Sequence, residues 1–73
     1  QQYQSIKADV IMNLVQKLTP GYRTVFNLYV IENYPHKEIA EMLNISIGSS
    51  KSNLAKAKIK LRELFKNYIN GSE

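Results

Sequence analysis

The amino-acid sequence predicts an all-α fold, a small four-helix domain that contains a helix-turn-helix motif. Apolar residues recur at spacings of three and four through most of the chain, as they do on the buried faces of amphipathic helices. Helix-breaking signals at Thr19-Pro20, at Asn33-Tyr34-Pro35 and at Asn44 divide this pattern into four segments. The third segment is short and the fourth is long and basic, which is the order of elements in a helix-turn-helix.

A chain of 73 residues has room for one domain with a modest core. We therefore expect a single domain over residues 1–73, with its core between about residues 14 and 66. The first residue is Gln rather than Met, so we expect the chain to be a piece of a longer protein.

The lack of cysteine and the presence of a single His exclude several kinds of chemistry. Disulfides and thiol nucleophiles need cysteine, and the usual zinc sites need several Cys or His ligands. His36 and Asp9 are the only residues of their types, and neither has a partner at catalytic spacing. The Gly48–Lys51 segment lacks the upstream glycine and the preceding strand of a phosphate loop. We expect no catalytic residue, no metal and no cofactor, and we interpret His36 as a surface residue at a helix start.

Positive charge is concentrated in the last third of the chain. Residues 1–50 carry four Lys or Arg against four Asp or Glu, whereas residues 51–73 carry six against two, and the net charge is +4. This segregation favours an anionic partner, either nucleic acid or a membrane surface, although a basic helix face is often only solvated. The chain lacks both an apolar run of the roughly 20 residues that span a bilayer and the apolar region of a signal peptide. We expect a cytoplasmic protein without a membrane partner.

Two helices are predicted before residue 35. The first covers residues 4–18, with an apolar stripe formed by Ile6, Val10, Ile11, Leu14, Val15 and Leu18. Thr19 suits the N-cap of the second helix and Pro20 suits its first position. We interpret the second helix as the central core helix because its apolar band is wide, comprising Tyr22, Val25, Phe26, Leu28, Tyr29, Val30 and Ile31. The Pro35 signal ends it, since the residue before a proline disfavours the α conformation.

The third helix is predicted over residues 36–43, followed by a tight turn. The small Ala40 allows a following helix to cross closely. Asn44 tolerates the left-handed conformation that reverses the chain, and Ile45 is placed to fill the corner from inside. Ser46 suits the N-cap of the next helix. This arrangement matches a helix-turn-helix, in which the second helix enters the DNA major groove.

The fourth helix has an inward seam and an opposite outer face. The seam repeats at spacings of three and four and consists of Ile47, Ser50, Leu54, Ala57, Leu61, Leu64 and Tyr68. On or near the outer face lie Gly48, Ser52, Ala55, Lys56, Ile59 and Glu63, with Lys51 and Lys60 on the flanks.

The first two turns of the outer face suit entry into a DNA groove. Gly48 and Ala55 leave room for base edges, Ser52 donates or accepts hydrogen bonds, and Lys51 and Lys56 reach base acceptors or phosphates. The helix N-terminus, with Ser49, Ser50 and its free N–H groups, adds a phosphate site. Four later charges, either solvated or steering phosphate, are Lys58, Lys60, Arg62 and Lys66.

Three motifs, taken in combination, resemble region 4 of bacterial sigma-70-family transcription initiation factors. They are LTPGYRTVF, KEIAEML, and ISIGSSKS followed by LAKAK. Within this family, the chain is similar to the extracytoplasmic-function group, over about residues 14–66. The resemblance implies a three- to four-helix bundle, winged-helix-like in outline, that binds the promoter −35 element in the major groove. It also implies packing on the β flap of the RNA polymerase core and occlusion by an anti-sigma factor. We expect a monomer in isolation.

The resemblance also implies which residues contact double-stranded promoter DNA. Positions that match those of the family are Gly48, Ser49, Lys51, Ser52, Ala55 and Lys56. Arg23 and Lys37 stand where family members place charge toward the DNA backbone or the polymerase. Asn53 stands where a phosphate-contacting Arg is common, and Ser50 stands where Val is usual. Asn44 replaces the usual turn Gly, and Pro35 replaces a common N-cap Ser.

Two other hypotheses remain open at this stage. The chain also fits a LuxR-type response-regulator output domain, which has four helices and dimerises through the last one. Alternatively, the heptad-like seam of the fourth helix pairs with another chain in a protein-interaction module. The additional helix before residue 19 favours the sigma interpretation over the response-regulator one.

Overall fold

The computed structural model describes the backbone of residues 2–71 and the side chains of residues 8–71. In chain order its elements are α1 (Gln2–Val15), α2 (Pro20–Phe26), the π-helical turn η1 (Asn27–Ile31), α3 (His36–Leu43) and α4 (Ile47–Ile69). The η1 turn continues α2, so the described chain forms four helical bodies, and residues 2–71 contain no strand. The predicted all-α, four-helix fold is confirmed.

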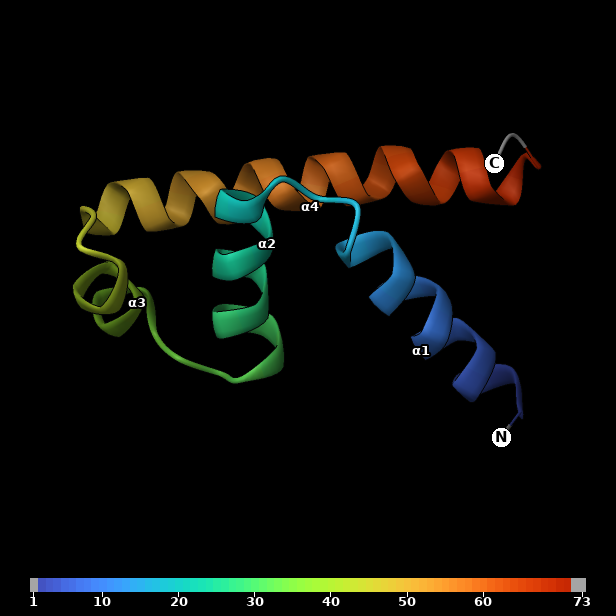
Figure 1. Ribbon diagram of the computed structural model, residues 1–73, viewed down its shortest axis with the longest axis horizontal. Helices are drawn as coiled ribbons and strands as arrows, with labels where there is room; N and C mark the ends of the chain where they lie inside the picture. Colours follow the sequence, from blue (N-terminus) through green and yellow to red (C-terminus); the bar gives the residue numbers. More distant parts are fainter. Residues whose placement is uncertain (1, 72–73) are drawn as a thin grey trace.

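Helix α4 is the element that α1, α2 and α3 all contact. Its 23 residues extend for about 35 Å at the rise of an α-helix, and they account for most of the longest dimension of the molecule, 38 Å. Figure 1 shows α3 near the N-terminal end of α4, α2 crossing α4 near its middle, and α1 leaving α4 obliquely. The shorter helices therefore cover successive parts of one long helix.

The hydrophobic core takes side chains from all four helices. Its buried members are Val15, Leu18, Val25, Phe26, Ile39, Leu54 and Ala57. Of the wide apolar band predicted for the second helix, only Val25 and Phe26 are buried, whereas Val30 and Ile31 are 41% and 50% exposed. The interpretation of the second helix as the central core helix is therefore wrong, since the central position belongs to α4.

The π-helical turn explains why only part of the predicted apolar band is buried. The Glu32 N–H donates to the Asn27 carbonyl at 3.0 Å, and the Tyr34 N–H donates to the Leu28 carbonyl at 2.9 Å. These hydrogen bonds enclose more residues than an α turn does, so the side chains that follow Asn27 are rotated away from the α-helical pattern. Asn33 then takes a left-handed conformation, with φ of 64°, and ends the helix near the predicted residue.

Helix α1 ends at Val15, three residues before its predicted end. The N–H groups of Lys17 and Leu18 donate to the carbonyls of Leu14 and Val15 at 2.9 and 3.0 Å, which tightens the chain into turns of three residues. Leu18 is buried nonetheless, so its side chain still completes the core. In the predicted stripe, Ile11 is 38% exposed, and the side chain of Ile6 lies outside the described residues.

The turn between α3 and α4 follows the predicted design. Asn44 is left-handed, with φ of 57°, and the Ile45 N–H donates to the Ala40 carbonyl at 3.0 Å. This is the Schellman arrangement, in which a left-handed residue after a helix lets the next N–H satisfy a terminal carbonyl. Ala40 is 6% exposed, and Ile45 is half-buried.

The buried site of Ala40 leads to a stability prediction. An Ala40→Leu substitution adds three carbons to a closely packed site, and we expect the free energy of unfolding to fall by about 1 to 3 kcal/mol. Chemical denaturation of the purified chain measures this change. The matched control is Ala55→Leu, because Ala55 is exposed on α4 and should tolerate the same enlargement. Equal stability of the two variants would show that α3 and α4 do not approach closely at Ala40.

Candidate nucleic-acid interface

The predicted seam of α4 faces the core over its middle section. Ser50, Leu54 and Ala57 are buried, and Leu61 and Leu64 are half-buried. The prediction is wrong at the two ends of the seam, because Ile47 and Tyr68 are 45% and 47% exposed. Ile47 is the first residue of α4 and lies beside the turn. Tyr68 lines an open hollow together with Val10 and Leu14 of α1.

The first turns of α4 present an outer face to solvent. We define the outer face as the exposed residues Gly48, Ser49, Lys51, Ser52, Ala55 and Lys56. A Cβ atom added at Gly48 would meet only the Ser46 Oγ, at 3.8 Å, which is an ordinary contact. Packing therefore does not require glycine at this position, and its small size instead leaves open space on the surface. The outer face combines small, hydroxyl and cationic groups on one rigid helix.

Ser46 is the N-cap of α4, as predicted. Its Oγ accepts from the Ser49 N–H at 2.9 Å, and its hydroxyl donates to the Ser49 Oγ at 3.0 Å. The backbone of Ser46 is extended, which is the usual N-cap conformation. The cap therefore holds the Ser49 hydroxyl at the N-terminal edge of the outer face.

The start of α4 has fewer free N–H and hydroxyl groups for a phosphate than the sequence predicted. The Ser49 N–H is occupied by the Ser46 cap, and the Ser50 N–H donates to the Ser46 carbonyl at 3.0 Å. The Ser50 side chain is buried, so its hydroxyl does not face solvent. The N–H groups of Ile47 and Gly48 stay without intrahelical acceptors, as the first N–H groups of any helix do.

The three remaining predicted site residues lie in different surroundings. Lys37 is exposed in the first turn of α3. Asn53 is half-buried and lines a shallow hollow with α2 and the turn, next to Thr24 and Ile45. Arg23 donates from Nη1 to the Gln16 carbonyl at 3.0 Å, so its guanidinium ties α2 to the end of α1. In the structure, Arg23 thus links α2 to the segment that follows α1.

A hydrogen bond between α3 and α4 is the main feature that the sequence predictions missed. The Nδ1 of His36 lies 2.8 Å from the Oγ of Ser50. The His36 ring also stacks on Tyr29, with ring centroids 4.3 Å apart and an interplanar angle of 16°. His36 begins α3, as predicted, but it is half-buried and bonded rather than freely exposed on the surface. The available signal was a Ser within an apolar seam, because a buried hydroxyl needs a partner.

The later basic residues of α4 divide into two groups. Lys60 forms an exposed ion pair with Glu63, with Nζ and Oε1 3.9 Å apart, and such a surface pair contributes little to stability. Lys58 and Arg62 instead line an apolar groove of about 290 Å³. Within the part of the chain whose side chains are described, no cluster of His, Cys, Asp or Glu has the arrangement of a metal site.

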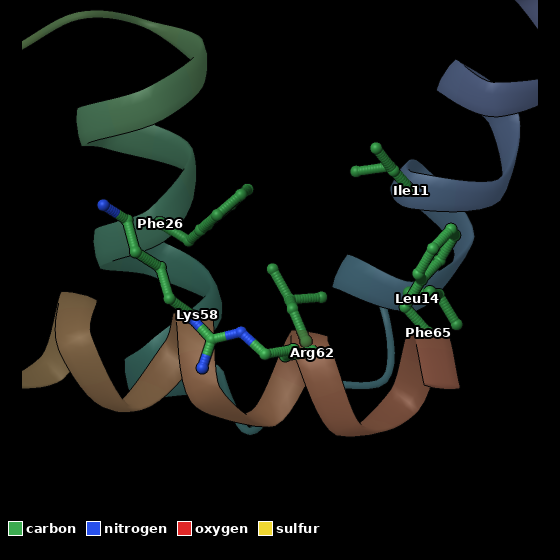
Figure 2. A pocket seen from close by; sticks show the side chains of 7 residues that line it. Ile11, Leu14, Phe26, Lys58, Arg62 and Phe65 are labelled. Atoms are coloured by element: carbon green, nitrogen blue, oxygen red, sulfur yellow. The ribbon is translucent and has the colours of Figure 1, made fainter. Parts of the chain in front are cut away.

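The groove lies between α1 and α2, with α4 as its floor. Figure 2 shows Ile11 of α1 and Phe26 of α2 pointing toward each other across it, while Lys58 extends upward from α4 and Arg62 runs along α4 toward Lys58. Its other apolar lining residues are Leu14, Leu61 and Phe65. The groove is thus a second surface feature, apart from the outer face at the start of α4.

The geometry defines a helix-turn-helix domain with an exposed, basic second helix, a class of domain that binds DNA. The family model described as "Sigma-70, region 4" matches residues 8–61, and the chain belongs to the sigma-70 family through this region. Region 4 is a DNA-binding, transcription-regulatory domain rather than a catalytic family. Comparison with curated proteins and with solved structures gives no match.

Family membership carries general expectations about partners. A sigma region 4 interacts with DNA and with RNA polymerase. Membership also favours the sigma interpretation over the response-regulator and interaction-module hypotheses. Within residues 2–71, no helix combines the length and the apolar character required to cross a bilayer.

The N-cap leads to a second stability prediction. Replacing Ser46 by Ala removes the acceptor of the Ser49 N–H, and we expect a loss of about 0.5 to 2 kcal/mol in the free energy of unfolding. Ser52→Ala is the matched control, because Ser52 is exposed inside α4, where Ala is the better helix former. Thermal unfolding followed by circular dichroism compares the two. A Ser46→Ala variant as stable as the control would contradict the role of the cap.

Proposed function

We propose that this domain recognises the promoter −35 element through the outer face of α4 and so directs transcription initiation by bacterial RNA polymerase. We further propose that it is the C-terminal domain of a sigma factor of the extracytoplasmic-function type, acting in the cytoplasm. The observation that carries the proposal is the outer face itself. Two turns of small, hydroxyl and cationic side chains follow a Schellman turn on a chain of the sigma-70 family.

The exposed residues of the outer face support direct contact with bases. A lysine ammonium donates to the O6 and N7 acceptors of guanine in the major groove, and a serine hydroxyl pairs with several base edges. Lys51 and Lys56 are the cations of this face, while Gly48 and Ala55 allow a close approach of the helix to DNA. Lys37 and the free N–H groups at the start of α4 would contact phosphates, which fix position without reading sequence.

The apolar groove supports a separate contact with the polymerase. We assign the groove as the seat of the β flap, with an anti-sigma factor competing for the same surface. A groove walled by Ile11 and Phe26 suits the apolar face of a partner helix, and Lys58 and Arg62 suit acidic residues at its edges. Because α1, α2 and α3 already contact α4, we also propose that the isolated domain is a monomer.

The first functional prediction concerns the two lysines of the outer face. Lys51→Ala and Lys56→Ala should each weaken binding by about 1 to 3 kcal/mol where the lysine contacts a base, and by less where it only neutralises phosphate. Affinity should also fall steeply with salt, because bound phosphates release counterions. Fluorescence anisotropy of a labelled duplex, selected by the wild-type chain from a random pool, measures both effects.

Lys66→Ala serves as the matched control for these substitutions. It removes the same charge from the last turn of α4, far along the helix from the outer face. Binding that is equally weakened by all three variants would point to net charge alone. Binding that is indifferent to Lys51, Lys56 and salt would overturn the assignment of the outer face.

A further prediction separates the groove from the outer face. Ile11→Gln places a polar side chain on the groove wall at a residue that is 38% exposed, so the fold should tolerate it. We expect at least a fivefold loss of affinity for RNA polymerase core enzyme and unchanged affinity for the selected duplex. The control is Ile69→Gln, since Ile69 is 63% exposed and is not part of the groove lining. Unchanged polymerase binding by Ile11→Gln would exclude the groove as the seat of the flap.

A further inference from the structure

The hydrogen bond between His36 and Ser50 stands at an unusual place in the fold. Ser50 is fully buried, and it is the only buried polar side chain among residues 8–71. A serine inside a helix often satisfies its hydroxyl with the carbonyl four residues earlier in the same helix. Here the hydroxyl instead meets the Nδ1 of His36, which belongs to the preceding helix, at 2.8 Å. The first turn of α4 is therefore joined to the first residue of α3 by a directional contact.

His36 is itself held from two further directions. Its ring stacks on Tyr29 of the π-helical turn, at a centroid distance of 4.3 Å. Pro35 precedes it with φ of −71° and ψ of 157°, and the pyrrolidine ring restricts φ at that residue. The imidazole thus connects η1, α3 and α4. A hydroxyl donates or accepts as its partner requires, so the contact forms with either neutral tautomer of the ring.

The residues joined by this bond adjoin the proposed DNA contacts. Ser50 directly precedes Lys51 and Ser52 of the outer face, and His36 directly precedes Lys37. An apolar contact at the same place would permit the two helices to slide and rotate slightly, whereas a hydrogen bond weakens as its angle departs from linearity. The bond therefore restricts the angle at which α4 leaves α3. It also restricts where Lys51 and Ser52 lie relative to Lys37.

We propose that His36 is a positioning residue for DNA recognition, which sets the orientation of α4 relative to α3 through its hydrogen bond to Ser50. The part of this inference that concerns DNA rests on the proposed function. The part that concerns helix orientation does not, and the experiment separates the two.

The variants test the hydrogen bond and the ring stacking of His36 separately. His36→Phe keeps a flat ring for Tyr29 but removes Nδ1, whereas His36→Asn keeps a polar group near the Nδ1 position and loses most of the stacking surface. Ser50→Val, combined with His36→Phe, replaces the whole pair by apolar groups, so neither partner of this hydrogen bond is left buried and unpaired. Glu41→Ala is the control on α3, because Glu41 is exposed.

The first measurement uses no DNA. Residual dipolar couplings of the labelled chain report the orientation of α4 relative to α3 in each folded variant. We expect a changed orientation in His36→Phe and in the double variant, and the wild-type orientation in His36→Asn and Glu41→Ala. An unchanged orientation in the double variant, which is the one designed to fold stably, would overturn the inference.

The second measurement compares selectivity with stability. Selectivity is the ratio of affinities for the duplex that the wild-type chain selects and for a scrambled duplex of equal length. We expect the double variant to melt at or above the wild-type temperature and yet to lose selectivity at least fivefold, while His36→Asn stays within twofold of wild type. Recovery of selectivity together with stability in the double variant would show a merely structural role and overturn the inference.

The two measurements also distinguish this inference from the proposed function. A wild-type chain that selects no duplex would refute the proposed function and, with it, the DNA part of the inference. The dipolar couplings would still decide, in that case, whether His36 orients α4.

Discussion

The burial of one side of α4 is the constraint on which the rest of the structure depends. A single helix of this composition, with Gly48 and several serines in its first two turns, has little tendency to persist alone in water. Its stability comes from the seam of Ser50, Leu54 and Ala57, which α1, α2 and α3 cover. The shorter helices thus hold a long helix rigid while one of its sides stays open to solvent. In the proposed function, this rigidity is what allows side chains on the open side to meet base edges at defined positions.

The local rules of helix termini made the helix-turn-helix predictable. Asn44, Ser46 and Ala40 act through their own backbone conformation, hydrogen bonds or size, and each is found as the sequence predicted. Helical periodicity predicted most of the exposed positions of the outer face, and the helix start together with the family resemblance added Ser49. The ends of the seam did not, because the exposure of Ile47 and Tyr68 depends on how far the neighbouring helices reach, which periodicity does not encode.

The features that escaped prediction are contacts between distant residues and one local change of helix geometry. His36 and Ser50 are 14 residues apart in sequence, and neither spacing nor composition indicates that they meet. The π-helical turn at Asn27–Ile31 needs one residue more than an α turn, and its sequence, NLYVI, reads equally well as ordinary helix. The contact of Arg23 with the chain after α1 also joins separate parts of the sequence, since its guanidinium donates to the carbonyl of Gln16. A residue must be exposed to contact DNA, but exposure alone does not make a contact. The fold therefore limits the candidate residues without selecting among them.

Gly48 has a consequence for how a domain of this kind changes over evolutionary time. A Cβ atom at this position would meet nothing closer than 3.8 Å. The fold would therefore accept an alanine here without a clash. Any constraint that keeps the position small must come from outside the folded chain, from whatever lies against α4. If α4 binds DNA as proposed, a replacement at position 48 would alter the binding surface without requiring a compensating change in the core.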